Sequence, residues 1–518
     1  MRLRIAGFLA VTMLTGAVAL AQKVAPSNAP PPPRTLSVIA TSDEHGWLDP
    51  LTQRNGEGFQ GGMAYLYGQL LGKEGYRPPS TLLLSAGDMW TGPYESTLLQ
   101  GRPMVQVMNS MGYDAAALGN HDFDFGQEAL ARRGSEASYP ILAANPYLAG
   151  TKTNPPYVKP WAISIVDGIK VGIVGLVTTE TPFTTDVRNL SGMEFGGYAD
   201  ALRREVPAVR AAGAQVVVVV AHADLKDLRP LASVARALGV PLIIGGHRHV
   251  GALEVDGGAS PATTDDVVLC NPGPYARSYC KIDLNLDPAT LLLKSQKSSI
   301  EIVAGNIKKP NFAPHEGVNQ VIADARMQAE ARGAEVLADV PSGLRRGEPV
   351  HTMGYLVLDA WMQALPNADF AVTNMGGFRQ DIEPGAVKLK DVISAMPFDN
   401  YLVIVDVTGA QLREVLENVQ SLPGGMTAEV KVDQTGKRTV LRVLDRNGKP
   451  LEDAKSYRVI INDFMYRGGD RYRFREYDSE AEETAVHWRD PLLRLLRAYG
   501  KATQPVSVTN VPRFTVQP

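Results

Sequence analysis

Short apolar runs, each followed by a cluster of polar residues, recur through the first half of the chain. The runs occupy residues 36–40, 82–84, 115–118, 216–220 and 242–244. Runs of this length, bounded by glycine and polar residues, are typical of strands buried on both faces of a sheet. Helical periodicity appears between them at residues 60–71 and 199–212, and further strand-like runs follow at residues 267–269, 281–286 and 291–303. The pattern predicts an α/β layered domain.

The second half of the chain opens on a segment of different composition. Residues 316–338 are rich in Ala, Glu, Arg and Gln, which predicts a long, mostly solvated helix between two compact regions. The remainder mixes predicted helices at residues 351–365 and 408–419 with predicted strands at residues 371–373, 402–407 and 457–461. A length of 518 residues also exceeds what one hydrophobic core usually supports, so we expect a second α/β or α+β domain.

The first residues have the three-part pattern of a secretory signal peptide. Arg2 and Arg4 precede an apolar stretch, and Ala19 and Ala21 form a small-x-small cleavage site. An N-terminal membrane anchor is the alternative, but the stretch is slightly short and is diluted by Thr and Gly. We expect a signal peptide at residues 1–21, a proline-rich linker at 22–35, and a periplasmic or secreted protein with no stable membrane insertion after cleavage.

Composition narrows the chemistry that the chain can perform. Two cysteines provide neither a disulfide scaffold nor a four-thiolate metal site. Cys270 and Cys280 flank a Pro-Gly-Pro turn between two predicted strands, so an oxidising compartment would let them pair across that hairpin. Two buried free thiols are the alternative, because sequence does not supply the Cα separation. Lys plus Arg is 52 against 55 for Asp plus Glu, so no basic excess indicates a nucleic-acid polymer as partner.

Metal-ligand residue types follow the predicted strands of the first domain. The clusters lie at residues 43–46, 87–88, 119–122, 222 and 245–249, and they contain five of the eight histidines. Because groups just past the carboxyl ends of strands converge on one crevice of an α/β sheet, these clusters are expected to meet at one site. A single Asp-x-His after a strand is usually a turn or a cap, but five such clusters in one domain indicate a metal centre.

The candidate ligands are carboxylate, imidazole and amide groups. Such a set suits Zn²⁺, Mn²⁺ or Fe²⁺ better than copper or an iron–sulfur cluster. The candidates are Asp43, His45, Asp88, Asn120, His222, His247 and His249. Seven ligands are too many for one tetrahedral centre, so we expect two divalent metal ions that share a carboxylate, ~3.5–4 Å apart as in phosphoryl-transfer sites.

These segments resemble the calcineurin-like metallophosphoesterase superfamily, and the second half narrows the resemblance to the exported 5′-nucleotidase/UDP-sugar hydrolase family. In the first domain it rests on SDEHG (42–46), SAGD (85–88), GNHDFDFG (119–126), AHAD (221–224) and GGHRH (245–249). In the second it rests on TNMGGFRQDI (373–382), MPFDNYLVIVDVTGAQL (396–412) and INDFMYRGGDRY (461–472). The resemblance implies an α/β fold: a four-layer β-sandwich catalytic domain flanked by helices (36–312), a connecting helix (313–338) and a smaller α/β substrate-binding domain (339–518).

The resemblance also implies a role for each cluster in the first domain. One metal ion would be bound by Asp43, His45, Asp88 and His249, and the second by Asp88, Asn120, His222 and His247, with Asp88 bridging. His121 would stabilise charge on the phosphoryl group or on the leaving oxygen. Asp124 would orient His121, as a carboxylate does in other His–Asp pairs.

In the second domain the resemblance implies the residues that hold the substrate. Arg379 would bind phosphate with its guanidinium fork, joined by either Arg345 or Arg346. Phe398 and Phe464 would stack on the base, while Asn400 and Asp470 would contact the base edge and the ribose hydroxyls. Core packing is the alternative for each phenylalanine. Arg471 stands where relatives often have Gly, and its charge is expected to favour substrates with an extra anionic group.

The function implied is the removal of phosphate from nucleoside 5′-monophosphates by in-line attack of a metal-bound hydroxide, in a protein that works as a monomer on a small-molecule nucleotide. Alternatives within the enzyme class are a 2′,3′-cyclic-nucleotide phosphodiesterase, a UDP-sugar hydrolase and a thiosulfate-ester hydrolase. From another class, the chain could be a periplasmic nucleotide- or metal-binding protein. That alternative leaves His121 and Asp124 without a purpose, because neither is needed for binding alone.

Overall fold

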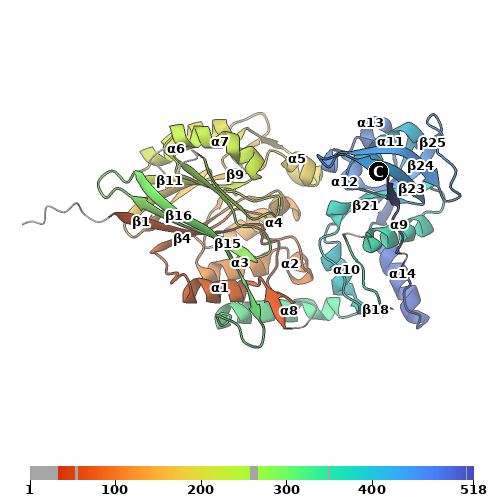
Figure 1. Ribbon diagram of the computed structural model, residues 1–518, viewed down its shortest axis with the longest axis horizontal. Helices are drawn as coiled ribbons and strands as arrows, with labels where there is room; N and C mark the ends of the chain where they lie inside the picture. The colour runs from red at the N-terminus through yellow and green to blue at the C-terminus, as the bar shows by residue number, and fades with distance from the viewer. Residues whose placement is uncertain (1–32, 53–56, 257–265, 348–349, 509, 518) are drawn as a thin grey trace, which may run out of the picture.

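A computed structural model describes residues 33–52, 57–256, 266–347, 350–508 and 510–517. The predicted signal peptide and nearly all of the predicted linker lie outside these ranges. The described chain forms two α/β bodies side by side, with the N-terminal half on the left and the C-terminal half on the right in Figure 1. Every helix in the described ranges is too short or too polar to cross a bilayer.

Two six-stranded sheets form the centre of the N-terminal body. The first has the order β16 (Leu293–Ile302), β15 (Ser278–Leu286), β1 (Arg34–Thr41), β4 (Thr81–Ser85), β5 (Ala115–Ala117), β6 (Ile141–Leu142). The second has the order β13 (Ala252–Asp256), β14 (Val267–Asn271), β12 (Leu242–Ile244), β11 (Val216–His222), β9 (Ile169–Val177), β8 (Trp161–Val166). The predicted apolar runs are β1, β4, β5, β11 and β12, which confirms their assignment as strands.

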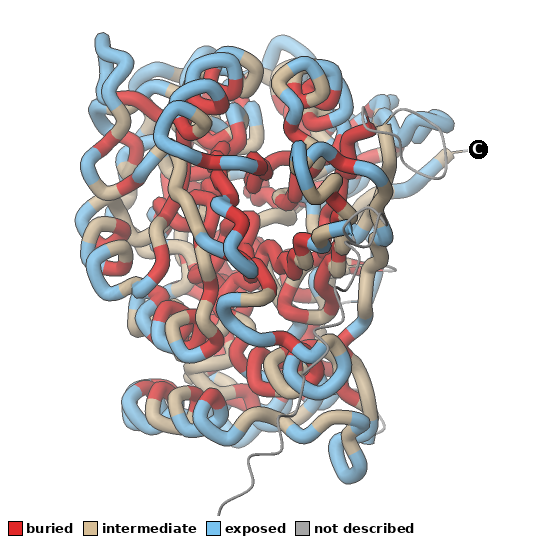
Figure 2. The backbone as a smooth tube through the Cα atoms, turned by 90° about the vertical axis from the view of Figure 1, so that its left-hand side faces the viewer, coloured by how far each residue is buried: buried red, intermediate tan, exposed pale blue. Residues whose placement is uncertain are grey.

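The two sheets pack face to face and carry helices on their outer faces. Alternate side chains, such as Val38 and Ala40 of β1 and Val218 and Val220 of β11, fill the core between the sheets. The outer face of the first sheet is covered by α1 (Met63–Gly72), α3 (Arg102–Met111), α4 (Gly126–Glu136) and α8 (Glu316–Gly333), and that of the second by α6 (Tyr198–Ala211) and α7 (Leu225–Ala237). Figure 2 shows burial concentrated on the central segments, with exposed positions on the outer turns. The order of layers, helices, sheet, sheet and helices, confirms the predicted four-layer sandwich.

Short elements complete the N-terminal body. They are β2 (Leu51–Thr52), β3 (Gly58–Gln60), β17 (Ala304–Asn306), α2 (Tyr94–Leu98), η1 (His121–Phe123), β7 (Pro146–Leu148), α5 (Thr181–Thr184), η2 (Val187–Leu190) and β10 (Met193–Phe195). Among them, α2 and α5 contact the second body. Within the sheets, β1, β4 and β5 run parallel, as do β9, β11 and β12. The carboxyl ends of the strands that precede the polar clusters therefore open toward one region.

A five-stranded sheet organises the C-terminal body. Its order is β22 (Ser421–Gly424), β19 (Phe370–Asn374), β25 (Ser456–Asn462), β21 (Tyr401–Thr408), β26 (Glu482–His487). One face packs on α9 (Thr352–Ala364), α10 (Leu389–Ala395) and α14 (Asp490–Lys501). The other packs on α11 (Gly409–Glu417) and on the sheet of β24 (Arg438–Asp445), β23 (Met426–Val432) and β27 (Phe514–Val516). The loops carry η3 (Met375–Gly377), α12 (Asp463–Tyr466), η4 (Gly469–Arg471) and α13 (Phe474–Tyr477).

Helix α8 runs along the base of the N-terminal body and reaches α10 at the near edge of the C-terminal body, as Figure 1 shows. It is less solvated than its composition predicts, because Val318, Ile322, Ala325, Ala329 and Gly333 form a buried stripe at helical spacing. The helix ends at Gly333, and β18 (Val336–Val340) then pairs with β20 (Gly385–Lys388) of the C-terminal body. The domain limits stay a proposal, and this pairing supports placing the start of the second domain before Val336.

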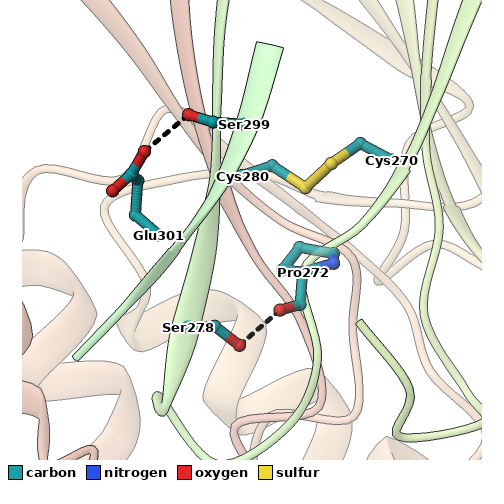
Figure 3. Close-up of a disulfide and its surroundings, with 6 residues drawn as sticks. All are labelled: Cys270, Pro272, Ser278, Cys280, Ser299 and Glu301. Atoms are coloured by element: carbon teal, nitrogen blue, oxygen red, sulfur yellow. Dashed lines mark hydrogen bonds between the residues drawn. A yellow bond between two sulfur atoms is a disulfide. The ribbon is translucent and has the colours of Figure 1, made fainter. Parts of the chain in front are cut away.

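Cys270 and Cys280 form a disulfide with their Cα atoms 6.5 Å apart. The predicted setting, a hairpin, is wrong: Cys270 lies in β14 of the second sheet, and Cys280 lies in β15 of the first. The bond therefore crosses the buried core and ties the two sheets together, as Figure 3 shows. Both cysteines are fully buried.

Removal of this disulfide is expected to destabilise the N-terminal domain without unfolding it. A bond that closes a loop with a sequence separation of 10 is worth about 2–3 kcal/mol in the chain-entropy model. The variant Cys270→Ala/Cys280→Ala should therefore unfold several degrees below the wild type in a thermal scan. Reductant serves as the control, because it should lower the unfolding temperature of the wild type and leave that of the variant unchanged. An equal effect of reductant on both proteins would contradict the prediction.

Candidate functional site

Each predicted metal-ligand cluster lies at the carboxyl end of a central strand or just after it. Asp43 and His45 follow β1, Asp88 follows β4, and Asn120 follows β5 of the first sheet. His222 is the last residue of β11, and His247 and His249 follow β12 of the second sheet. Because the two sheets face each other, residues separated by two hundred positions meet at one edge of the sandwich.

The six charged or imidazole ligand candidates fall into two groups, within each of which the potential ligand atoms lie within 4.8 Å of one another. One group is Asp43, His45 and His249, and the other is Asp88, His222 and His247. The amide Oδ1 of Asn120 lies 3.1 Å from Nε2 of His222 and so adjoins the second group. Asp88 stands between the groups, with Oδ2 3.5 Å from Nε2 of His45 and 3.1 Å from Nε2 of His222.

The backbone of these residues adopts a conformation that L-amino acids rarely use. Asp43, His45, Asp88, His247 and His249 have φ between 46° and 79°. A non-glycine residue held in this region costs on the order of 1–3 kcal/mol, and such residues persist where the surroundings over-determine them, often at functional sites. Five strained ligand candidates in one site indicate that the backbone conformation of these loops is determined by where the side chains must lie, rather than by the preferences of the turns.

The donor atoms fit two divalent cations. Oδ2 of Asp88 is buried and has no well-directed hydrogen bond in the described part of the chain, where His222 at 3.1 Å and His45 at 3.5 Å approach it, although a buried carboxylate oxygen normally has a partner. Nε2 of His45 and Nε2 of His249 face each other at 2.9 Å. Burial, and then the charge of Arg379, hold the pKa of His45 well below its usual value, so its ring is neutral and offers a lone pair. The fold with these two candidate sites therefore implies divalent metals.

Asp122, which sequence reasoning left without a role, holds the ligand loops together. Its carboxylate accepts hydrogen bonds from the backbone N–H groups of Asp88 and Met89 and from that of Gly119. Burial raises the pKa of Asp122 well above its usual value. The sequence indicates Asp122 only through its position next to His121 in GNHDFDFG. That position does not distinguish a carboxylate that accepts hydrogen bonds from the loop backbone from one that binds metal.

His121 and Asp124 form the predicted pair. Nδ1 of His121 lies 2.9 Å from Oδ2 of Asp124, and the backbone N–H of His121 donates to Oδ1 of Asp88 at 2.8 Å. The His121 ring thus adjoins the ligand groups, with its tautomer fixed by a carboxylate, and both residues line a cavity beside these groups.

This cavity, of about 530 Å³, is lined by both domains. The C-terminal domain contributes the predicted substrate residues Arg379, Phe398, Asn400, Phe464 and Asp470. Nη2 of Arg379 lies 3.2 Å from Nε2 of His45, so the guanidinium is directly at the candidate metal site. Phe398 stacks on His121 with ring centroids 5.5 Å apart. Both phenylalanines face the cavity and are only partly buried, which separates them from the core aromatics.

Arg345 and Arg346 lie outside the lining of this cavity. Arg345 forms ion pairs with Asp381 and Glu383. Arg346 donates from Nη1 to the backbone carbonyls of Phe378 and Arg379, at 2.9 and 2.8 Å. The structure thus brings Arg346 to the backbone that carries Arg379, rather than to the space that a substrate would fill.

Glu180 is a further residue that the sequence did not reveal. Its Oε2 lies 3.2 Å from Nε2 of His247 and 3.2 Å from Nη2 of Arg248, and its Oε1 accepts from Nη2 of Arg471 at 2.8 Å. The hydrogen bond with His247 lowers the pKa of Glu180 to about 2. Arg471 therefore forms an ion pair across the domain boundary and lies outside the cavity lining, and its expected effect on substrates with an extra anionic group stays a prediction.

Comparison with known proteins agrees with this geometry. The family model for calcineurin-like phosphoesterases matches residues 36–251, and that for the 5′-nucleotidase C-terminal domain matches residues 333–476. Protein UshA of Escherichia coli is 27% identical over 521 residues, covering 92% of this chain and 92% of that protein. The 5′-nucleotidase of Vibrio cholerae is 24% identical over 486 residues, covering 84% and 85%.

Among solved structures, the 5′-nucleotidase precursor from Thermus thermophilus has the same fold, with a TM-score of 0.79 and 22% identity over 93% of this chain and 99% of that chain. Both family models occur in the order that the two bodies have here. The chain belongs to the 5′-nucleotidase family of calcineurin-like phosphoesterases and is a metal-dependent hydrolase.

Proposed function

We propose that the protein removes phosphate from nucleoside 5′-monophosphates by in-line displacement at phosphorus. The observation that carries this proposal is the shared cavity into which both His121 of one domain and the Phe398–Phe464 pair of the other face. A metal-binding protein without turnover has no use for a tautomer-fixed histidine beside the ligands. A hydrolase without a nucleobase specificity has no use for two partly exposed phenylalanines in the same space.

The metal ligands proposed are Asp43, His45, Asp88 and His249 for one ion and Asp88, Asn120, His222 and His247 for the other, with Asp88 between them. A divalent pair supplies charge neutralisation at the phosphoryl oxygens and acidifies bound water. The contribution of the chain itself is to hold these groups in strained, buried loops before substrate arrives, so that little reorganisation is needed during the reaction.

We infer that His121 interacts with the phosphoryl group or the leaving 5′ oxygen. Its Nδ1 is occupied by Asp124, so Nε2 is the atom directed to the substrate. Arg379 is proposed to bind the phosphate; a guanidinium fork matches two phosphate oxygens, and its contact with His45 supports this role. Phe398 and Phe464 are proposed to stack on the base, and Asn400 and Asp470 to bind the nucleoside edge.

We further propose that the protein is exported to the periplasm or beyond and acts there as a monomer. The buried disulfide supports export, since such bonds form in oxidising compartments. Monomeric action is supported by the cavity, whose two walls come from two domains of one chain.

His121→Ala is expected to lower kcat for AMP hydrolysis by about 10²–10⁴-fold, the range for loss of a general acid–base group. Metal content, measured by mass spectrometry after dialysis, should stay at the wild-type value, which separates a catalytic role from a ligand role. His315→Gln is the matched control, because His315 caps α8 far along the chain from the site. Near-wild-type turnover in metal-loaded His121→Ala would refute the role of His121.

Asp88→Asn tests the bridging carboxylate. Because Asp88 lies between both ligand groups, its neutralisation should reduce metal from two ions per wild-type chain to one or fewer and abolish phosphate release. Asp283→Asn, a partly exposed position of β15, is the control and should keep both ions. The same metal content in Asp88→Asn and in the wild type would show that Asp88 is not shared.

Phe398→Ala and Phe464→Ala test nucleobase recognition. Stacking worth ~1–3 kcal/mol per base predicts a KM for AMP that is about 5- to 150-fold higher in each variant. The KM for p-nitrophenyl phosphate, which lacks a nucleobase, should change much less. A panel of AMP, UMP, 2′,3′-cyclic AMP and UDP-glucose on the wild type decides between the proposed activity and its relatives. Equal losses on AMP and on p-nitrophenyl phosphate would favour a purely structural role for the phenylalanines.

A further inference from the structure

One segment of the metal-binding domain forms part of the cavity wall and contacts the candidate ligand Asn120 through Thr184 and Thr185. It runs from α5 to η2, and its residues Thr184, Thr185, Asp186, Arg188 and Asn189 line the cavity. In Figure 1, α5 lies at the edge of the N-terminal body that faces α12. None of these residues belongs to a motif that sequence analysis identified.

Arg188 extends from this segment into the C-terminal domain. Its Nη2 lies 3.0 Å from Oδ2 of Asp463. Its Nε donates to Oδ2 of Asp186 at 2.9 Å, so a carboxylate of its own loop fixes the direction of the side chain. The guanidinium is therefore held in place on one side and makes an interdomain ion pair on the other.

Asp463 is the residue through which this ion pair reaches the proposed nucleoside site. Its side chain is 3% exposed, and its Oδ1 accepts hydrogen bonds from Nδ2 of Asn400 at 3.0 Å and from the backbone N–H of Tyr401 at 3.1 Å. A buried carboxylate is costly without a charged partner. Arg188 at 3.0 Å is a closer cationic partner than Arg467, which lies 3.8 Å away.

The contact with Asp463 fixes the orientation of the side-chain amide of Asn400. An ionised carboxylate can only accept hydrogen bonds, so Asn400 must present its NH₂ group to Asp463. That assignment leaves Oδ1 and the second N–H hydrogen to meet a ligand in the cavity. Without the charge of Arg188, Asp463 would keep only the more distant Arg467 as a cationic partner, and its hydrogen bond would hold the Asn400 amide less firmly.

We propose that Arg188 is a positioning residue for nucleoside binding, which acts through Asp463 on the side chain of Asn400. This inference rests on the proposed function, in which Asn400 contacts the nucleoside. Because Arg188 and Asn400 belong to different domains, the nucleoside contact is complete only when the two domains face each other as they do in this structure. Recognition of the nucleoside is thereby linked to the domain that carries the metal ligands.

A double-mutant cycle in the full-length, metal-loaded enzyme tests the inference. Arg188→Ala and Asn400→Ala should each lower kcat/KM for AMP about 10-fold, mainly through KM. The double variant should be within twofold of Asn400→Ala, because Arg188 has nothing left to position. Arg188→Lys should recover part of the loss. Arg203→Ala, an exposed arginine of α6 that pairs with Asp200, is the matched control and should keep wild-type kinetics.

Substrate choice separates this role from a structural one. With p-nitrophenyl phosphate, which has no nucleoside, Arg188→Ala should lose less than twofold in kcat/KM. Its unfolding temperature should lie below that of Arg203→Ala, because the buried carboxylate of Asp463 loses its nearest cation. If the losses in kcat/KM of the two single variants multiply in the double variant, Arg188 acts directly on substrate. If Arg188→Ala loses the same factor on AMP and on p-nitrophenyl phosphate, its role is structural. Either result overturns the inference. If the wild type hydrolyses p-nitrophenyl phosphate but no nucleotide, the proposed function fails and the inference fails with it. Unchanged AMP kinetics in Arg188→Ala would overturn the inference alone.

Discussion

The buried carboxylate of Asp88 is the group on which the rest of the site depends. It follows β4 and lies within 3.5 Å of ring nitrogens of His45 from its own sheet and His222 from the other sheet. A charge in such a place is tolerated only if it is paired or bound to metal. The face-to-face packing of the two sheets is what brings both histidines to it. A shift of either sheet would separate the two ligand groups.

The loops around Asp88 show how a fold can hold a strained constellation. The left-handed backbone at the ligand residues carries a local cost, and Asp122 offsets part of it by accepting three backbone hydrogen bonds, from residues 88, 89 and 119. The disulfide between β14 and β15 ties the sheets together behind the site. Rigid support of this kind suits a reaction in which electrostatic preorganisation supplies most of the stabilisation.

The division of labour between two domains requires contacts that align them. Arg379 reaches His45 from the C-terminal domain, while Glu180 and Arg188 of the N-terminal domain reach Arg471 and Asp463 in return. These contacts lie around the cavity. The proposed binding of the phosphate and of the nucleoside of the substrate therefore depends on the relative orientation of the two domains. The exposed ion pair of Arg471 contributes little to stability by itself. Loss of Arg188, by contrast, would leave the buried carboxylate of Asp463 without its nearest cation.

The amino-acid sequence by itself determined the strands and the ligand types. Strands such as β4 and β11 are buried on both faces, and that burial leaves a continuous apolar run that can be read locally. The clusters after them are equally local, so Asp43, Asp88, His121 and His222 could be predicted together with the family. Only the tertiary structure decided that Cys270 and Cys280 join two sheets rather than a hairpin, that Arg346 supports the backbone at Arg379, and that Glu180 and Arg188 cross between domains. Those contacts join residues up to nearly three hundred positions apart, and their geometry depends on sheet packing and on domain orientation, which leave no periodic trace in the chain.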